Sequence, residues 1–195
     1  MITYLTSYTQ RANMRLYNLY NIYNGYNRYT VNNKHNIKES ETMQIIAVAN
    51  QKGGVGKTTT SHAMCAGLAE KGFKVLGIDL DPQGNFSTAC GAENYNVPTS
   101  YELMKEEASA EEAIQQTKSG FDVIPSNIML AGAEQELSQT GKEYRLKEAI
   151  SPIAGNYDFI IIDTPPSLGV LTVNAFTFAS DILIPTTAGI FAATG

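Results

Sequence analysis

One stretch decides the fold of this chain: Lys52-Gly53-Gly54-Val55-Gly56-Lys57-Thr58-Thr59. It follows a short apolar run, residues 45–49, that is typical of a buried strand. It precedes residues 56–70, whose small and apolar side chains favour a helix packed on a sheet. Its glycines allow the backbone to curl with the N–H groups pointing inward, and the helix that follows adds unpaired N–H groups and its dipole. A loop of this kind between a strand and a helix is typical of phosphate binding.

The stretch matches the P-loop pattern Gly-x-x-x-x-Gly-Lys-[Ser/Thr], with Gln51 in the place of the first glycine. In this pattern the lysine, here Lys57, contacts the β- and γ-phosphates, and the hydroxyl of Thr58 ligates Mg²⁺. The phosphate-binding residues that the pattern predicts are Gly53, Gly54, Val55, Gly56, Lys57, Thr58 and Thr59. Because the loop contacts phosphates alone, it predicts a nucleoside triphosphate without identifying the base.

Three aspartates follow apolar runs. Asp79 and Asp81 come after residues 75–78. Asp163 follows residues 159–162, which are the clearest buried strand in the sequence. Ligands of an open parallel sheet gather at the carboxyl ends of its strands, so these positions are candidates for the site. Asp163 fits a Walker B element, whose aspartate holds Mg²⁺ through the water shell of the ion.

Strand-like and helix-like runs alternate from residue 43 onward, which predicts an α/β fold: a doubly wound, mainly parallel sheet with both faces covered by helices. Ser109-Ala110-Glu111-Glu112 matches a capping box and predicts a short helix. Gly72 is placed to end the first helix, and Pro152 is placed to stop a longer one. The remaining elements are predicted as strands over residues 121–125 and 182–185 and as helices over residues 128–150 and 168–178.

Composition limits the classes of protein. The 195 residues carry a net charge of −5, and two cysteines, Cys65 and Cys90, make neither a disulfide framework nor a four-ligand metal site. The sequence has no apolar run of about 18 residues and no signal-peptide pattern, so we expect a cytoplasmic protein without membrane contact. Residues 43–195 hold nine Lys and Arg against seventeen Asp and Glu, which argues against a generally basic nucleic-acid-binding face in this part.

Residues 1–42 differ from the rest of the chain. They hold seven of the eleven tyrosines and eight asparagines, and neither a helical nor a two-residue period persists. We interpret them as a disordered or spurious extension, with upstream DNA translated in frame before a natural start at Met43 as the leading explanation. The alternative is a nucleic-acid-binding arm that uses Arg11, Arg15 and Arg28. We also expect the domain of residues 43–195 to be incomplete at its C-terminus.

The loop and two later segments resemble one family. Lys52, a second lysine inside the loop, resembles the deviant P-loop of the ParA and MinD group. The run Asp79-Leu80-Asp81-Pro82-Gln83-Gly84-Asn85, called the switch I segment below, resembles switch I of ParA/Soj proteins. Thr164-Pro165-Pro166-Ser167 resembles their switch II, and the resemblance covers residues 43–188.

The resemblance implies an ATPase that needs Mg²⁺ and forms a homodimer with ATP. It implies catalytic roles for Lys52, Lys57 and Asp81. Lys52 would reach across the dimer interface to the nucleotide of the other subunit, and Asp81 would position the attacking water or support the metal. Asp79 is expected to buttress the loop. The metal ligands that the resemblance implies are Thr58, Asp81 and Asp163.

The resemblance further implies a role in plasmid or chromosome partitioning, with a ParB-type centromere-binding partner, non-specific DNA as the track, and a nucleoid-associated location in the cytoplasm. Two alternatives stay open. The first is a MinD-like positioning ATPase that acts on a membrane or a protein cluster, which a C-terminal amphipathic helix would distinguish. The second is a truncated remnant that keeps the loop but hydrolyses no ATP.

Overall fold

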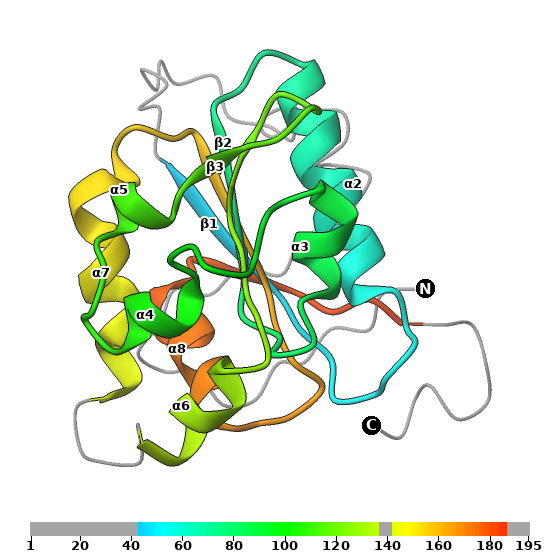
Figure 1. Cartoon of the computed structure of the whole chain (residues 1–195). Helices are drawn as coiled ribbons and strands as arrows, with labels where there is room; N and C mark the ends of the chain where they lie inside the picture. The colour runs from blue at the N-terminus through cyan, green and yellow to red at the C-terminus, as the bar shows by residue number, and fades with distance from the viewer. Residues whose placement is uncertain (1–42, 137–141, 187–195) are drawn as a thin grey trace, which may run out of the picture.

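The computed structural model describes residues 43–136 and 142–186. They form three layers, a six-stranded sheet between two layers of helices (Figure 1). The strand order is β3-β4-β2-β5-β1-β6. Each pairing is parallel except that of β3, an edge strand that runs antiparallel to β4. The predicted α/β fold with a doubly wound, mainly parallel sheet is therefore confirmed.

The strands are short, and the central ones are buried over nearly their whole length. Their bounds are β1 Gln44–Val48, β2 Val75–Asp79, β3 Gln115–Gln116, β4 Asp122–Ile124, β5 Phe159–Asp163 and β6 Asp181–Leu183. The five longer strands lie where apolar runs predict them, whereas β3 consists of two glutamines and has no strand pattern. In register, Asp163 lies beside Val48 of β1 and Asp79 of β2, so the carboxyl ends of these three strands are level.

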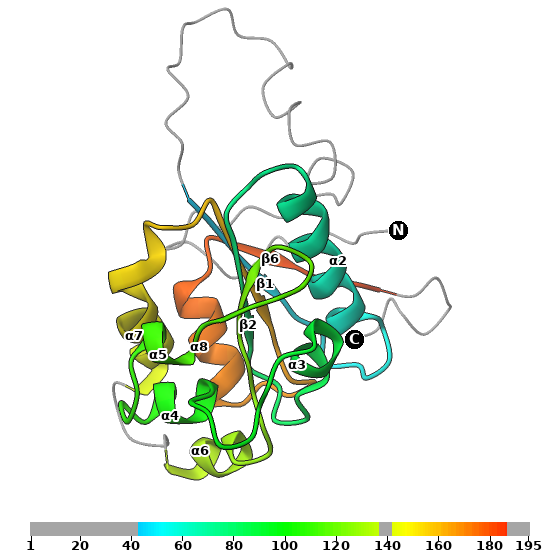
Figure 2. The ribbon, with the colours of Figure 1, turned by 45° about the horizontal axis from the view of Figure 1, so that its top comes forward.

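The helices divide between the two sides of the sheet (Figure 2). On one side are α2 (Lys57–Glu70) and α3 (Asn85–Cys90), and on the other are α4 (Ser100–Met104), α5 (Ala110–Ala113), α6 (Leu130–Glu136), α7 (Arg145–Ala154) and α8 (Val170–Phe178). Successive side chains of a strand point to opposite faces, and two apolar clusters result. Ile161 of β5 belongs to the cluster under α2, while Ile160 and Ile162 belong to the cluster under α7 and α8.

A glycine allows α3 to pack closely on β2. A Cβ atom on Gly77 would lie 2.7 Å from Cζ of Phe86, whose side chain has no exposed surface. Gly77 thus leaves the space that the ring of Phe86 fills. Because α3 follows directly after the switch I segment, this contact fixes the position of that segment's end.

One predicted helix is wrong. Residues 128–150 do not form a continuous helix, because α6 and α7 are separate and the 3₁₀ turn η1 (Lys142–Tyr144) precedes α7. Pro152 does not stop the second helix either, since it lies inside α7, which continues to Ala154. Proline removes one helical hydrogen bond, but Ile153 and Ala154 bury their side chains in the core and hold the last turn in place.

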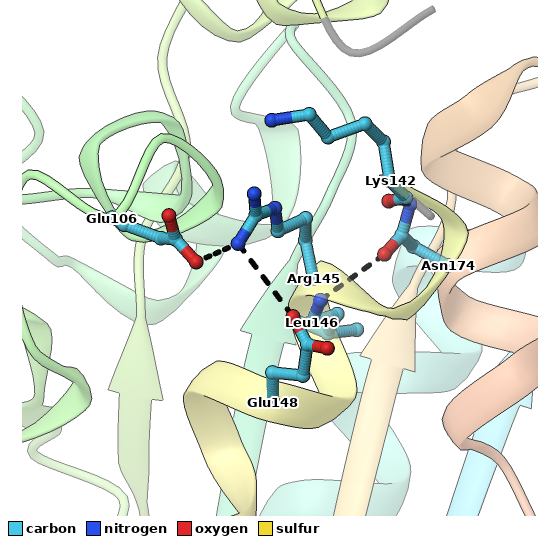
Figure 3. A network of polar contacts seen from close by, with 6 residues as sticks. All are labelled: Glu106, Lys142, Arg145, Leu146, Glu148 and Asn174. Carbon is cyan, nitrogen blue, oxygen red and sulfur yellow. Dashed lines mark hydrogen bonds and ion pairs between the residues drawn. The ribbon is translucent and has the colours of Figure 1, made fainter. Parts of the chain in front are cut away.

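Polar contacts join the start of α7 to its neighbours (Figure 3). Asn174 of α8 is fully buried, and its Oδ1 accepts a hydrogen bond of 3.1 Å from the N–H of Leu146. Its Nδ2 donates to the carbonyl of Lys142 at 2.9 Å. Asn174 thereby satisfies an N–H group in the first turn of α7 that has no partner within the helix. Beside it, Arg145 forms an ion pair with Glu106 of the loop after α4.

The smaller sequence predictions have mixed outcomes. The capping box at Ser109 is confirmed, since its side chain and that of Glu112 each accept from the other's N–H at the start of α5. Gly72 lies just after α2 with φ 87°, as its predicted role requires. A second capping box, at Thr99 before α4, was not predicted. The interpretations of residues 1–42 and of the end of the chain fall outside the described residues.

Among the described residues, no helix is both long and apolar enough to span a membrane.

Candidate functional site

The loop between β1 and α2 lies at the carboxyl end of the sheet (Figure 1). Gly54 and Gly56 have φ angles of 71° and 89°, which residues with a Cβ rarely adopt, so the backbone conformation itself calls for glycine. A Cβ on Gly53, Gly54 or Gly56 would meet no atom within 4 Å, and this space lets a ligand approach the backbone closely. Of the other predicted phosphate contacts, Val55 is buried and Thr59 is exposed in the first turn of α2.

Asn50 fixes the start of this loop. Its Nδ2 donates to the carbonyl of Pro185 at 2.8 Å, and its Oδ1 accepts from the N–H of Lys52 at 2.9 Å. The side chain therefore ties the loop to the segment after β6. An asparagine that accepts from the N–H two residues ahead is a common turn residue, which is the only signal for Asn50 in the sequence.

The start of α2 brings one cation and two hydroxyls to the carboxyl end of the sheet. The helix starts at Lys57 without a side-chain cap, so its free N–H groups can bind an anion. Lys57 is only 8% exposed although it is charged. The hydroxyl of Thr58 donates to Oδ2 of Asp163 at 2.8 Å, and the hydroxyl of Ser61 donates to Oδ1 of the same carboxylate at 2.7 Å.

Asp163 is fully buried at the end of β5. Burial raises the pKa of Asp163 to about 6, the hydrogen bonds from Ser61 and Thr58 act against this rise, and the negative charge of Asp81 adds to it. Because the hydroxyl of Thr58 donates a hydrogen bond to Asp163, the lone pairs of its oxygen stay free for a cation. This pair of oxygen donors fits a hard cation such as Mg²⁺, whose charge would favour the ionised carboxylate.

Asp79 is a second buried carboxylate, and it accepts three hydrogen bonds. Its Oδ1 accepts from the N–H of Asp81 at 3.0 Å, and its Oδ2 accepts from the N–H and the hydroxyl of Ser87 at 2.8 and 2.7 Å. Burial raises the pKa of Asp79 to about 7, the hydroxyl of Ser87 acts against this rise, and the charge of Asp163 adds to it. Asp79 thus holds the switch I segment from behind, which agrees with the expected buttressing role.

Asp81 stands at the tight turn of the switch I segment and is 8% exposed. Its Oδ1 accepts from the N–H of Gln83 at 3.0 Å, and its carbonyl accepts from the N–H of Gly84 at 2.9 Å. Gly84 has φ 63°, and a Cβ there would lie 2.9 Å from the carbonyl oxygen of Ser126. Both the conformation and the close contact therefore require glycine at this turn.

The structure brings four of the predicted site residues together: Lys57, Thr58, Asp81 and Asp163. Thr58 contacts Asp163 directly, and the charges of Lys57 and Asp81 both act on that carboxylate. The side chain of Lys52 does not join them. It is exposed, and within the part of the chain that the structure describes it forms no hydrogen bond or ion pair.

Three residues of the site were missed in the sequence: Asn50, Ser61 and Ser87. Ser61 lies one turn after Lys57 and three residues after Thr58, so helical spacing could have placed it near Asp163. Ser87 had no comparable signal, because its role depends on α3, a helix that was not predicted.

A glycine-rich loop between a buried strand and a helix, with Lys57 at its end and a hydroxyl bound to a buried aspartate, defines a P-loop nucleotide-binding domain. The family model of the AAA domain AAA_31 matches residues 43–195. The chain therefore belongs to this family, and its relatives identify it as a member of the ParA/Soj family, as its loop and switch segments predicted.

Individual relatives are similar over most of this chain. The sporulation initiation inhibitor protein Soj of Bacillus subtilis is 49% identical over 145 residues, which cover 73% of this chain and 57% of Soj. The chromosome partitioning protein ParA of Caulobacter vibrioides is 45% identical over 158 residues, which cover 78% of this chain and 59% of ParA. The chain thus spans a little under three fifths of the length of these two relatives.

A solved structure has the same fold. Cobyrinic acid a,c-diamide synthase from Mycobacterium smegmatis, with a bound ATP analog and magnesium, matches with a TM-score of 0.71 and 44% sequence identity. The match covers 74% of this chain and 60% of that protein.

Replacing Ser61 by alanine is expected to lower the free energy of unfolding by about 1–3 kcal/mol, because Oδ1 of the buried Asp163 loses its donor. Urea denaturation in magnesium-free buffer measures this change. Ser151→Ala is the matched control, since both serines donate to the carbonyl four residues earlier but Ser151 is exposed. The control should change the free energy of unfolding by less than about 0.5 kcal/mol. Equal effects of the two variants would contradict the role of Ser61.

Proposed function

We propose that this chain binds and hydrolyses ATP with Mg²⁺, dimerises when ATP is bound, and serves plasmid or chromosome partitioning. The observation that carries the proposal is the contact of Thr58 with buried Asp163 beside the nearly buried Lys57. The magnesium and ATP analog bound to the Mycobacterium smegmatis relative support the choice of ligands. The name of the chromosome partitioning protein ParA of Caulobacter vibrioides supports the biological role.

The loop and the start of α2 bind the phosphates. The N–H groups around Gly54 and Gly56 face the anion, and Lys57 supplies a positive charge to the β- and γ-phosphates. Thr58 and Asp163 would hold Mg²⁺, Thr58 through its oxygen and Asp163 through the water shell. When bound, the ion offsets the charge that develops on the phosphate oxygens.

Asp81 is the residue that we assign to the attacking water. Its Oδ1 accepts from the N–H of Gln83, and among the described residues Oδ2 has no hydrogen-bond donor. Oδ2 can therefore accept a hydrogen from water and orient its lone pair toward the γ-phosphate. Support of the metal through the same carboxylate is compatible with this position, because the charge of Asp81 acts on Asp163.

Lys52 supplies the second positive charge, and it does so in the other subunit of a homodimer. Asn50 fixes its backbone, while its exposed side chain points to no acceptor among the described residues. A cation that arrives from a second subunit stabilises charge on the transferring phosphoryl group, so hydrolysis would depend on dimerisation. By resemblance, a ParB-type protein and non-specific DNA are the further partners, and the nucleoid is the location.

Lys57→Ala is expected to remove nucleotide binding, because the loop loses the charge that contacts the β- and γ-phosphates. Isothermal calorimetry with Mg²⁺ and ATP should show at least about a hundredfold weaker binding, which corresponds to about 3 kcal/mol. Lys118→Ala is the control, since Lys118 is exposed in the turn between β3 and β4, at the opposite end of the sheet. Unchanged affinity in Lys57→Ala would refute the proposed phosphate site.

Asp81→Ala and Asp81→Asn are both expected to bind ATP but to stall hydrolysis. Asparagine keeps an oxygen for the N–H of Gln83 and so preserves the turn, which isolates the loss of the charge. Phosphate release should fall by about a hundredfold or more in both variants. Undiminished release in Asp81→Asn would show that its carboxylate does not act on the water.

Lys52→Ala is expected to impair the ATP-dependent dimer and the turnover that depends on it, while monomeric ATP binding persists. Sedimentation velocity with a non-hydrolysable ATP analogue measures the dimer, and Lys118→Ala again serves as a surface lysine control. If the dimer and the turnover rate equal those of the control, Lys52 is a surface lysine without this role.

A further inference from the structure

Ser87 is a fully buried residue of α3 that connects two strands of the sheet. Its N–H and its hydroxyl both donate to Oδ2 of Asp79, at the end of β2. Its hydroxyl oxygen accepts from the N–H of Ser126, after the end of β4, at 2.8 Å. One small side chain therefore acts as donor and as acceptor toward two different strand ends.

The effect of Ser87 extends to Asp81 through Asp79. Oδ1 of Asp79 accepts from the N–H of Asp81, and Oδ2 receives the two donors of Ser87. The two oxygens of a carboxylate turn together about one bond, so the donors on Oδ2 also set the direction of Oδ1. Two consecutive hydrogen bonds thus lead from the hydroxyl of Ser87 to the backbone of Asp81.

The end of β4 packs against the same segment. The carbonyl of Ser126 would lie 2.9 Å from a Cβ on Gly84, and it accepts from Nδ2 of Asn94 at 3.1 Å. The hydroxyl of Ser100 donates to the carbonyl of Asp79 at 2.5 Å. Ser87 joins the same two partners through its hydroxyl, which donates to Asp79 and accepts from Ser126, so the loss of this hydroxyl would loosen the segment on this side.

We propose that Ser87 is a positioning residue for hydrolysis, which acts through Asp79 to fix the backbone of Asp81 and so the carboxylate that orients the attacking water. This inference rests on the proposed function, because Asp81 acts on water only if the chain hydrolyses ATP. The hydrogen-bond partners of Ser87 are Asp79 and Ser126, and neither belongs to the loop that binds phosphate. Its loss therefore lowers turnover and leaves nucleotide affinity nearly unchanged.

The energetic reason lies in the burial of the network. Without the hydroxyl of Ser87, Oδ2 of Asp79 keeps one donor of two, and the N–H of Ser126 loses its acceptor. Both groups are in positions that have no exposed surface, where an unsatisfied polar group is costly. The network relieves this cost if the switch I segment moves, and such a movement displaces Asp81.

The experiment compares Ser87→Ala with Ser126→Ala in the full chain. Ser126 is the matched control because its hydroxyl is also buried but has no hydrogen-bond partner among the described residues, so the same change removes no hydrogen bond. Phosphate release gives kcat, and calorimetry gives the affinity for a non-hydrolysable ATP analogue with Mg²⁺. In Ser87→Ala, kcat should fall by about tenfold or more, with analogue affinity within about threefold of wild type. In Ser126→Ala, both values should stay within about twofold of wild type.

A second measurement does not depend on turnover. Amide hydrogen exchange without nucleotide reports the hydrogen bond from Asp81 to Asp79, and the N–H of Asp81 should exchange faster in Ser87→Ala than in wild type or Ser126→Ala. If the alanine variant does not fold, Ser87→Cys replaces it, since a thiol has nearly the same shape but is a weak donor. The cysteine variant should change kcat and exchange in the same direction.

Three results would overturn the inference about Ser87 alone: unchanged kcat, equal losses of kcat in Ser87→Ala and Ser126→Ala, or a loss of analogue affinity as large as the loss of kcat. In each of these the wild-type chain releases phosphate. No phosphate release by wild type overturns the proposed function, and with it the catalytic part of this inference. The exchange of the Asp81 N–H then still decides whether Ser87 positions that residue.

Discussion

The two hydroxyl contacts of α2 with the carboxylate of Asp163 are the constraint on which the candidate site depends. Thr58 and Ser61 each donate to one oxygen of this carboxylate, so the first two turns of the helix are fixed to the end of β5. The register of the sheet places Asp163 level with Val48, where the loop begins, and with Asp79, where the switch I segment begins. Loop, helix and switch I segment are thus all positioned relative to one carboxylate.

This arrangement buries two carboxylates, and the positive charge of Lys57 compensates only part of their negative charge. Asp79 and Asp163 have no exposed surface, and burial raises both of their pKa values, to about 7 and about 6. Burial therefore carries a free-energy cost for the charged form of each carboxylate. Serine and threonine hydroxyls offset part of this cost, and Lys57 is the lysine whose charge lowers the pKa of Asp163. A divalent cation bound as we propose would offset the remainder.

The sequence predicted the central strands because a parallel strand buried on both faces is a continuous apolar run. The P-loop pattern made Lys57 and Thr58 candidates for the site, and the end of an apolar run made Asp163 a candidate. The sequence did not predict the break before α7. It also predicted wrongly that Pro152 would stop the helix, because the buried side chains of Ile153 and Ala154 outweigh the local effect of proline. Motif patterns identify residues that contact the ligand. The residues that position these ligand contacts cannot be identified from a motif, because their role depends on the packing of the whole domain.

Asn50, Ser61 and Ser87 illustrate this limit. Each bonds to a residue distant in sequence: Asn50 to Pro185, Ser61 to Asp163, and Ser87 to Ser126. Such contacts have no fixed spacing along the chain, since they exist only when strand ends meet at one edge of the sheet. Their presence in the structure is therefore independent support for a site at this edge, beyond the motif.

The surface, and not the phosphate site, must distinguish what such domains do. Relatives of this chain are called a sporulation inhibitor, a partitioning protein and a diamide synthase, while the P-loop contacts phosphates alone. Lys52 belongs both to the phosphate-binding loop and to the surface, because Asn50 fixes its backbone while its side chain is exposed. Because the backbone of Lys52 is fixed and its ammonium group is exposed, this positive charge can contact a molecule that covers the loop. If the chain hydrolyses ATP as we propose, the identity of that molecule would control when hydrolysis occurs.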